Sequence, residues 1–350
     1  MSNLFTRLLA EKPFLLADGA TGTNLFAMGL ISGDSPELWN TDHPDRIAKH
    51  YRSFIDAGSD IVLTNTFGGT SYRLKLHDAQ DRVDELNEAA ARILMAEVAK
   101  CDREVVVAGS MGPTGEILDP SGDLSVELAA KAFADQAMAL KKGGVDVLWI
   151  ETMSSAEETE AAVRGASVAG LPIVTTLSID TNGRTMMGLT GEDIVKLQPT
   201  LDVLPAAFGT NCGLGASEVV AAVLNMKTAA SSAGVAPMII AKANCGIPEW
   251  VDGEIRYNGT PEIMARFATM AIDAGARIVG GCCGTSPEHI AAMRKSMDAY
   301  VAGEEPDLEQ IVSQLGDITA GAKAQLGGDV SIEGGAVGGA RRRVSRRRKE

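Results

Sequence analysis

Residues 145–179 read VDVLWIETMSSAEETEAAVRGASVAGLPIVTTLSI and contain two short apolar runs on either side of a longer amphipathic segment. The runs at 145–152 and 172–179 are brief and rich in β-branched residues, which favours strands. The segment between them begins near Ser155 among acidic residues and ends at Gly170, as helix caps require. The stretch therefore predicts a strand, a helix and a second strand.

The same pattern extends in both directions along the chain. Helix-like segments return to strands through the similar sequences AGSDIV, GGVDVL and AGARIV. The eight apolar runs cover residues 14–18, 60–66, 104–110, 145–152, 172–179, 206–212, 238–245 and 277–283. Because eight strand and helix units close a parallel sheet on itself, residues 1–303 are predicted to form a single-domain (β/α)8 TIM barrel of the α/β class.

The segment 304–350 falls outside this pattern, because it is rich in glycine and then arginine and lacks the apolar residues of a core. We expect a surface helix over 304–318 and a disordered basic tail from about residue 320. The formal charge of the chain is −14, and the last ten residues contribute +6, which leaves about −20 on the rest. An acidic body argues against nucleic acid as a partner, since phosphate binding needs a cationic surface.

The sequence contains neither an export signal nor an apolar stretch long enough for a membrane span, so a cytoplasmic protein is expected. Its five cysteines are odd in number and two are adjacent, which favours metal or catalytic use over disulfides. No glycine-rich nucleotide motif follows the first predicted strand. Nucleotide cofactors therefore have no support.

Polar side chains stand at the carboxyl ends of the predicted strands, which meet at one mouth of such a barrel. These strand ends carry Asp18 and Gly19, Asn65 to Phe67, Ser110, Glu151 and Thr152, Asn211 and Cys212, Asn244 and Cys245, and Cys282 and Cys283. The predicted mouth is therefore the candidate functional site.

The cysteines at these ends suggest a metal. Three thiolates from Cys212, Cys282 and Cys283 plus one exchangeable position would describe a catalytic zinc site, and glycines beside the adjacent pair let the backbone approach closely. The alternative is that the three are small buried apolar residues. Cys245 is either a fourth ligand or a bystander, and Cys101, at a helix end, is expected to be structural.

Asp18 and Glu151 lie in apolar sequence surroundings, where an unpaired charge is costly. An α-ammonium group held between them would compensate both, with backbone N–H groups of the loop that starts at Gly19 binding an α-carboxylate. Asp18 could instead cap the following helix. Two other classes stay open: a barrel that binds zinc without catalysis, and a barrel lyase or hydrolase with Lys242 as a Schiff-base residue.

Six motifs together resemble the homocysteine S-methyltransferases, a family that includes betaine-dependent enzymes and the homocysteine module of cobalamin-dependent methionine synthase. The motifs are LLADGATGTNL at 15–25, DIVLTNTFGGT at 60–70, AGSMGPTG at 108–115, IETMSSAEE at 150–158, GTNCG at 209–213 and IVGGCCGTSPEHI at 278–290. The resemblance covers residues from about 10 to 300.

This resemblance implies methyl transfer to homocysteine in a (β/α)8 barrel. It implies that Zn²⁺ is held by Cys212, Cys282 and Cys283. It also implies that Asp18 and Glu151 bind the amino group of homocysteine. Thr66, Phe67 and Asn211 would line the pocket. A thiol bound to such a zinc has a lowered pKa and attacks the methyl carbon as a thiolate, without a general base.

The methyl donor is less defined. The sequence at 8–30 and the PELWN motif at 36–40 look most like bacterial betaine enzymes, which implies glycine betaine as donor and dimethylglycine as product. A quaternary ammonium needs an aromatic cage, for which the candidates are Trp39, Phe67, Tyr72 and Trp250.

This chain departs from the animal betaine enzymes, which carry tyrosines where Gly68 and Thr152 stand here. S-methylmethionine, or a separate corrinoid or folate methyl-carrier protein, therefore remains an alternative donor. The long dimerisation arm of the animal enzymes has no counterpart, so the subunit count, including a homo-oligomer, stays open.

Overall fold

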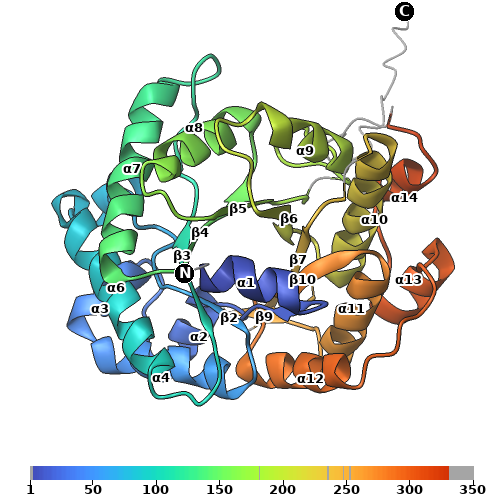
Figure 1. Cartoon of the computed structure of the whole chain (residues 1–350), viewed down its shortest axis with the longest axis horizontal. Helices are drawn as coiled ribbons and strands as arrows, with labels where there is room; N and C mark the ends of the chain where they lie inside the picture. Colours follow the sequence, from blue (N-terminus) through green and yellow to red (C-terminus); the bar gives the residue numbers. More distant parts are fainter. Residues whose placement is uncertain (1–2, 181, 235, 247, 252–253, 331–350) are drawn as a thin grey trace, which may run out of the picture.

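The computed structural model describes residues 3–180, 182–234, 236–246, 248–251 and 254–330. Eight parallel strands form a central barrel, and helices surround it (Figure 1). The barrel strands are β1 (Leu15–Leu16), β2 (Ile61–Leu63), β3 (Val106–Met111), β4 (Val147–Met153), β5 (Ile173–Leu177), β6 (Ala207–Cys212), β7 (Ile239–Ala243) and β10 (Ala276–Gly281).

The strand order is β1-β10-β7-β6-β5-β4-β3-β2, and every neighbouring pair is parallel. A bridge between Ala17 and Ile61 joins the two outermost strands. In addition, the Asp60 N–H donates to the Leu16 carbonyl at 2.6 Å. The sheet is therefore nearly closed, and the predicted single-domain (β/α)8 barrel is confirmed.

Helices of the outer layer cover the strands because their apolar faces need burial. The helices are α1 (Leu4–Glu11), α2 (Gly22–Ala27), α3 (Trp39–Asp42), α4 (Pro44–Asp56), α5 (Ser71–Leu74), α6 (Val83–Val98), α7 (Val126–Gly143), α8 (Ala156–Ser167), α9 (Gly191–Leu197), α10 (Ala216–Ser232), α11 (Pro261–Asp273), α12 (Pro287–Asp298), α13 (Leu308–Leu315) and α14 (Ala320–Leu326). Several begin with side-chain caps. In α8, for example, the Ser155 hydroxyl accepts from the Glu158 N–H.

Helix α1 lies across the barrel axis (Figure 1) and closes its amino-terminal end. Phe5, Leu8 and Leu9 of this helix are buried against a cluster that includes Trp149 and Ile240 from the barrel strands. Side chains alternate along a strand, so a residue two positions after an interior apolar residue also faces the barrel interior. Polar side chains therefore also face the interior at the carboxyl-terminal end of the strands, opposite the end that α1 closes.

Two elements differ from expectation. An antiparallel hairpin of β8 (Pro248–Val251) and β9 (Glu254–Tyr257) interrupts the connection between β7 and α11. The expected helix within 304–318 is present as α13. Disorder from about residue 320 is wrong for Ala320–Leu326, which forms α14 because Ala322 is buried and the Gly321 N–H donates to Asn182 Oδ1 at 2.6 Å.

The arginine-rich end of the predicted tail, residues 331–350, lies outside the described residues. Within the part of the chain that is described, no helix combines the length and apolar composition needed to cross a bilayer.

Candidate active site at the barrel mouth

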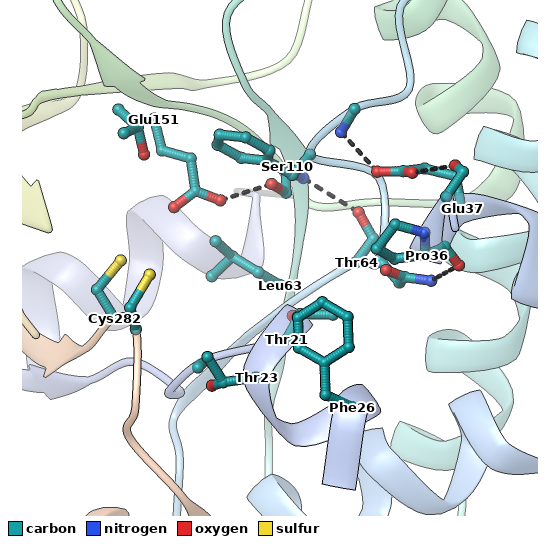
Figure 2. Close-up of a pocket in the computed structure, with 18 of the residues that line it drawn as sticks. Thr21, Thr23, Phe26, Pro36, Glu37, Leu63, Thr64, Ser110, Glu151 and Cys282 are labelled. Carbon is teal, nitrogen blue, oxygen red and sulfur yellow. Dashed lines mark hydrogen bonds between the residues drawn. The ribbon is translucent and has the colours of Figure 1, made fainter. Parts of the chain in front are cut away.

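A cavity of about 500 Å³ opens at the carboxyl ends of the strands. Its wall contains Glu151 from β4, Cys212 from β6, Lys242 from β7, and the Cys282 and Cys283 pair that follows β10. Figure 2 shows Cys282 and Glu151 on one side of this space. Residues distant in sequence thus meet at one site because their strands end at the same rim.

The sulfur atoms of Cys212, Cys282 and Cys283 all lie within 4.8 Å of one another. Cys212 adopts a φ of 64°, a conformation that is unfavourable for a residue with a side chain. The backbone of the pair is held by the Cys282 N–H, which donates to Ala243 O at 2.7 Å, and by Cys283 O, which accepts from the Cys245 N–H at 2.9 Å. Local strain and these bonds place the three thiols together.

The glycines beside the pair are required by close packing. A Cβ atom on Gly281 would lie 2.2 Å from Thr285 Cγ2, and one on Gly284 would lie 2.3 Å from the ring of Tyr257. Tyr257, from β9, thus packs beside the thiols, although nothing in its sequence surroundings indicates this.

The chemistry of the three thiols fits a metal site. Hydrogen bonding lowers the pKa of Cys212 through Cys282 but raises it through Cys283, and with burial the net effect raises this pKa to about 12. The pKa of Cys283 is likewise raised to about 12. Hydrogen bonding to Cys212 lowers this pKa, but the effects of Cys282 and of burial are larger and raise it. Crowded thiols resist ionisation unless a cation compensates them, and thiolate ligands suit zinc and other soft metals.

Cys245 stands apart from this cluster. Its buried thiol donates to the Gly259 carbonyl at 3.3 Å, and burial raises its pKa to about 11. Among the described residues, the cluster of possible metal ligands comprises Cys212, Cys282 and Cys283 without it. Cys101 follows α6, on the outer layer, and is partly buried.

A buried lysine changes the expected environment of Asp18. Lys242 Nζ lies 2.9 Å from Asp18 Oδ1, while the Leu63 N–H donates to Asp18 Oδ2 at 2.7 Å. The carboxylate of Asp18 is therefore not unpaired as its sequence surroundings suggested. Burial raises the pKa of Asp18, and the charge of Lys242 opposes this rise. Asp18 does not line the cavity, whereas its neighbour Gly19 does.

Glu151 lines the same cavity and also interacts with the lysine. The Ser110 hydroxyl donates to Glu151 Oε1 at 2.6 Å (Figure 2). Burial raises the pKa of Glu151, while the charge of Lys242 lowers it. Two carboxylates share one lysine here, so the group carries one excess negative charge when all three are ionised. An ammonium group would neutralise it.

Comparison with known proteins gives the family. A sequence profile described as homocysteine S-methyltransferase matches residues 15–297. The chain belongs to the homocysteine S-methyltransferase family.

Two mycobacterial methionine synthases are similar in sequence to this chain. That of Mycobacterium tuberculosis (strain ATCC 25618 / H37Rv) is 30% identical over 295 residues, which are 79% of this chain and 24% of that protein. That of Mycobacterium leprae (strain TN) is 29% identical over 310 residues, or 82% of this chain and 25% of that protein. The chain spans about a quarter of the length of these relatives.

Solved structures of the homocysteine methyltransferase MmuM from Escherichia coli share the fold. The metallated form has a TM-score of 0.69 and 23% identity, and the match covers 84% of this chain and 99% of that one. The apo form has a TM-score of 0.64 and 21% identity, with 84% and 100% covered.

Two residues predicted to line the pocket, Thr66 and Asn211, do not line the cavity but bond to residues that form its wall. The Thr66 hydroxyl donates to Ser110 O at 2.7 Å and is fully buried. Asn211 Oδ1 accepts from the Thr152 N–H at 2.9 Å, and Asn211 Nδ2 lies 3.7 Å from Cys282 Sγ. Thr152 itself lines the cavity with a φ of 63°. Phe67, the third predicted residue, reaches the cavity.

Two residues proposed for the aromatic cage, Trp39 and Tyr72, do not line this cavity. Trp39 is buried, with its ring against His43 at a centroid distance of 5.0 Å and Arg46 above it at 4.9 Å. Tyr72 packs against the core, and neither it nor Trp39 is among the lining residues. Trp250 is part of β8, but its side chain lies outside the described part of the chain.

Phe26 of α2 also lines the cavity and was missed by the sequence analysis. Its position one turn beyond the GATGT loop, on the first helix after β1, is the signal that could have found it.

Proposed function

We propose that this protein transfers a methyl group to the thiol of homocysteine, giving methionine, with zinc held by Cys212, Cys282 and Cys283. Three thiols and the carboxylate of Glu151, a partner for an ammonium group, line one cavity. This observation carries the proposal. A zinc ion with three thiolate ligands keeps one position for the substrate thiol and lowers the pKa of that thiol.

The residues of the chain would bind and orient the rest of homocysteine. Glu151 is proposed to accept the α-ammonium group, since it lines the cavity and its Oε2 accepts no hydrogen bond from the described residues. Asp18 would act through Lys242, which it neutralises. Backbone N–H groups near Gly19 would bind the α-carboxylate. This arrangement directs the side-chain thiol toward the cysteine cluster.

The donor is proposed to be a small methylated cation. Glycine betaine was the expectation from sequence. Among the described side chains proposed for its cage, Phe67 lines the cavity while Trp39 and Tyr72 do not, and Phe26 lines it as well. S-methylmethionine is the second candidate. The cavity is also lined by the carboxylate of Glu37 and the guanidinium group of Arg73, which match the ammonium and carboxylate groups of an amino acid.

The experiment incubates zinc-loaded protein with homocysteine and, separately, glycine betaine, S-methylmethionine and methyltetrahydrofolate, and measures methionine. Methionine from one of the two small cations is expected. Methionine from methyltetrahydrofolate alone would contradict the proposed donor class. No methionine from any donor would contradict a free-standing reaction and favour a methyl-carrier protein.

Replacing Glu151 with Gln should weaken homocysteine binding by about 10–100-fold, the effect of losing one charge-assisted hydrogen bond. Lys242 and Asp18 would then neutralise each other and leave no excess negative charge to attract the incoming ammonium group. The measurement is the dissociation constant of homocysteine by calorimetry, without donor, together with zinc content, which should not change.

The matched control is Glu157→Gln, because Glu157 is exposed in the first turn of α8 and does not line the cavity. Unchanged homocysteine affinity in Glu151→Gln would exclude the proposed role of Glu151.

A further inference from the structure

The wall of the cavity opposite the cysteines carries two charged groups that the proposed reaction at the thiol does not use. We infer that Glu37 and Arg73 bind the head group of the methyl donor, with Glu37 accepting its ammonium group and Arg73 pairing with its carboxylate. The donor would then be an amino acid with an activated methyl group on its side chain. This inference rests on the proposed methyl transfer.

The fold places both groups away from the thiols. In the strand order of the barrel, β2 and β3 stand opposite β6 and β7. Arg73 belongs to α5, which follows β2, and its guanidinium packs on the loop after β3, where a Cβ atom on Gly115 would lie 2.9 Å from Arg73 Nη1. Glu37 lies after β1, and Figure 2 shows it on the side of the cavity away from Cys282.

Arg73 lines the cavity without an anionic partner. Among the residues that the structure describes, no carboxylate lies within 4.0 Å of its guanidinium nitrogens, whereas Arg52, Arg82 and Arg164 each have such a partner. The side chain of Arg73 is only partly exposed. A guanidinium group held in this way suits a carboxylate, which it can bind through two parallel hydrogen bonds.

Glu37 presents the complementary charge from a buried position. It is 5% exposed and lines the cavity, and no described cation lies within 4.0 Å of it. The Gly68 N–H donates to Glu37 Oε1 and the Ser35 hydroxyl donates to Glu37 Oε2, each at 2.6 Å. These bonds hold the carboxylate but leave its charge uncompensated. A bound ammonium group would compensate it.

The same contact explains why glycine stands at position 68. A Cβ atom on Gly68 would lie 2.9 Å from Glu37 Oε1, so the carboxylate occupies the space that a side chain at this position would need. Phe26 and Phe67 line the cavity as well, and their ring faces can attract a methylated cation.

S-methylmethionine has the required chemistry, because its sulfonium is separated from its ammonium and carboxylate by a short carbon chain. The thiolate of homocysteine would form a new S–C bond with the methyl carbon while the donor S–C bond breaks. The electron pair of the broken bond stays on the donor sulfur, and the thiol proton leaves to solvent. Two molecules of methionine result, one from each substrate.

Glycine betaine has a single cation next to its carboxylate. With its methyl group at the thiol, it would leave the charge of Glu37 unpaired. Asp34 and His77 are further titratable residues that line the cavity.

The test compares the zinc-loaded full chain with its Arg73→Met and Glu37→Gln variants at saturating homocysteine. Each variant should lower kcat/KM for S-methylmethionine by about 10–100-fold, since each loses one charge-assisted contact. The KM for homocysteine should change by less than about threefold, and turnover of trimethylsulfonium, which lacks both head-group charges, should be unaffected. The control is Lys75→Met, an exposed cation two residues from Arg73 that does not line the cavity.

Calorimetric titration with S-methylmethionine, without turnover, separates this inference from the proposed function. Weaker binding in both variants than in Lys75→Met supports the inference. The inference is overturned if the variants bind S-methylmethionine as tightly as Lys75→Met does, or if the unaltered protein does not bind it. It is also overturned if the variants lose as much activity with trimethylsulfonium as with S-methylmethionine. Absence of methionine from every donor would instead contradict a free-standing reaction, and the titration alone would then decide the inference.

Discussion

Replacing Cys283 with Ala should abolish both zinc retention and methyl transfer. The free energy of zinc binding at four-ligand sites is about 10–16 kcal/mol, so each ligand contributes roughly 3–4 kcal/mol, or on the order of 10²–10³ in affinity. The two remaining thiols lie in the same crowded cluster but would offer too few ligands for the ion. Metal content by mass spectrometry and methionine formation are the measurements.

Cys245→Ala is the matched control, because Cys245 is a buried thiol that lies outside the cluster. This variant should keep about one equivalent of zinc per chain and most of its activity. If Cys283→Ala also kept one equivalent of zinc and full activity, Cys283 could not be a ligand.

Replacing Lys242 with Met should destabilise the fold by about 3–5 kcal/mol, the usual cost of removing one partner of a buried ion pair. Lys242 is 2% exposed and Asp18 is 1% exposed, so the variant would leave the Asp18 carboxylate buried without its cation. The free energy of unfolding in urea is the measurement. A loss below about 1 kcal/mol, as for an exposed ion pair, would contradict the importance of this pair.

The destabilisation should depend on pH. Burial already raises the pKa of Asp18 in the folded state, and removing Lys242 takes away the charge that opposes this rise. The folded variant then holds a proton that the unfolded chain releases. The contribution of Asp18 to stability is therefore full below its pKa in the unfolded chain and is lost as pH rises through the raised folded-state pKa. The double variant Asp18→Asn with Lys242→Met is the control, because it should remove this pH dependence.

The sequence contained enough information for the barrel but not for its additions. Eight apolar runs with helix caps between them predicted the strand and helix repeat, because periodicity and capping are local properties. Helix α14 was missed because a short glycine-containing segment is helical only when tertiary packing stabilises it, here against α10 and Asn182. The hairpin of β8 and β9 was missed because its strands are too short to show a period.

The candidate site was also predicted only in part from the sequence. The sequence by itself determined that Cys212, Cys282, Cys283 and Glu151 would share one rim, because all strands of a parallel barrel end on the same side. Only the tertiary structure decided that Lys242 pairs with Asp18, that Trp39 turns into the core, and that Glu37 and Arg73 reach the cavity. These outcomes depend on strand register and on the paths of the loops after β1 and β2. Both are set by contacts between distant segments, which no local pattern of residues encodes.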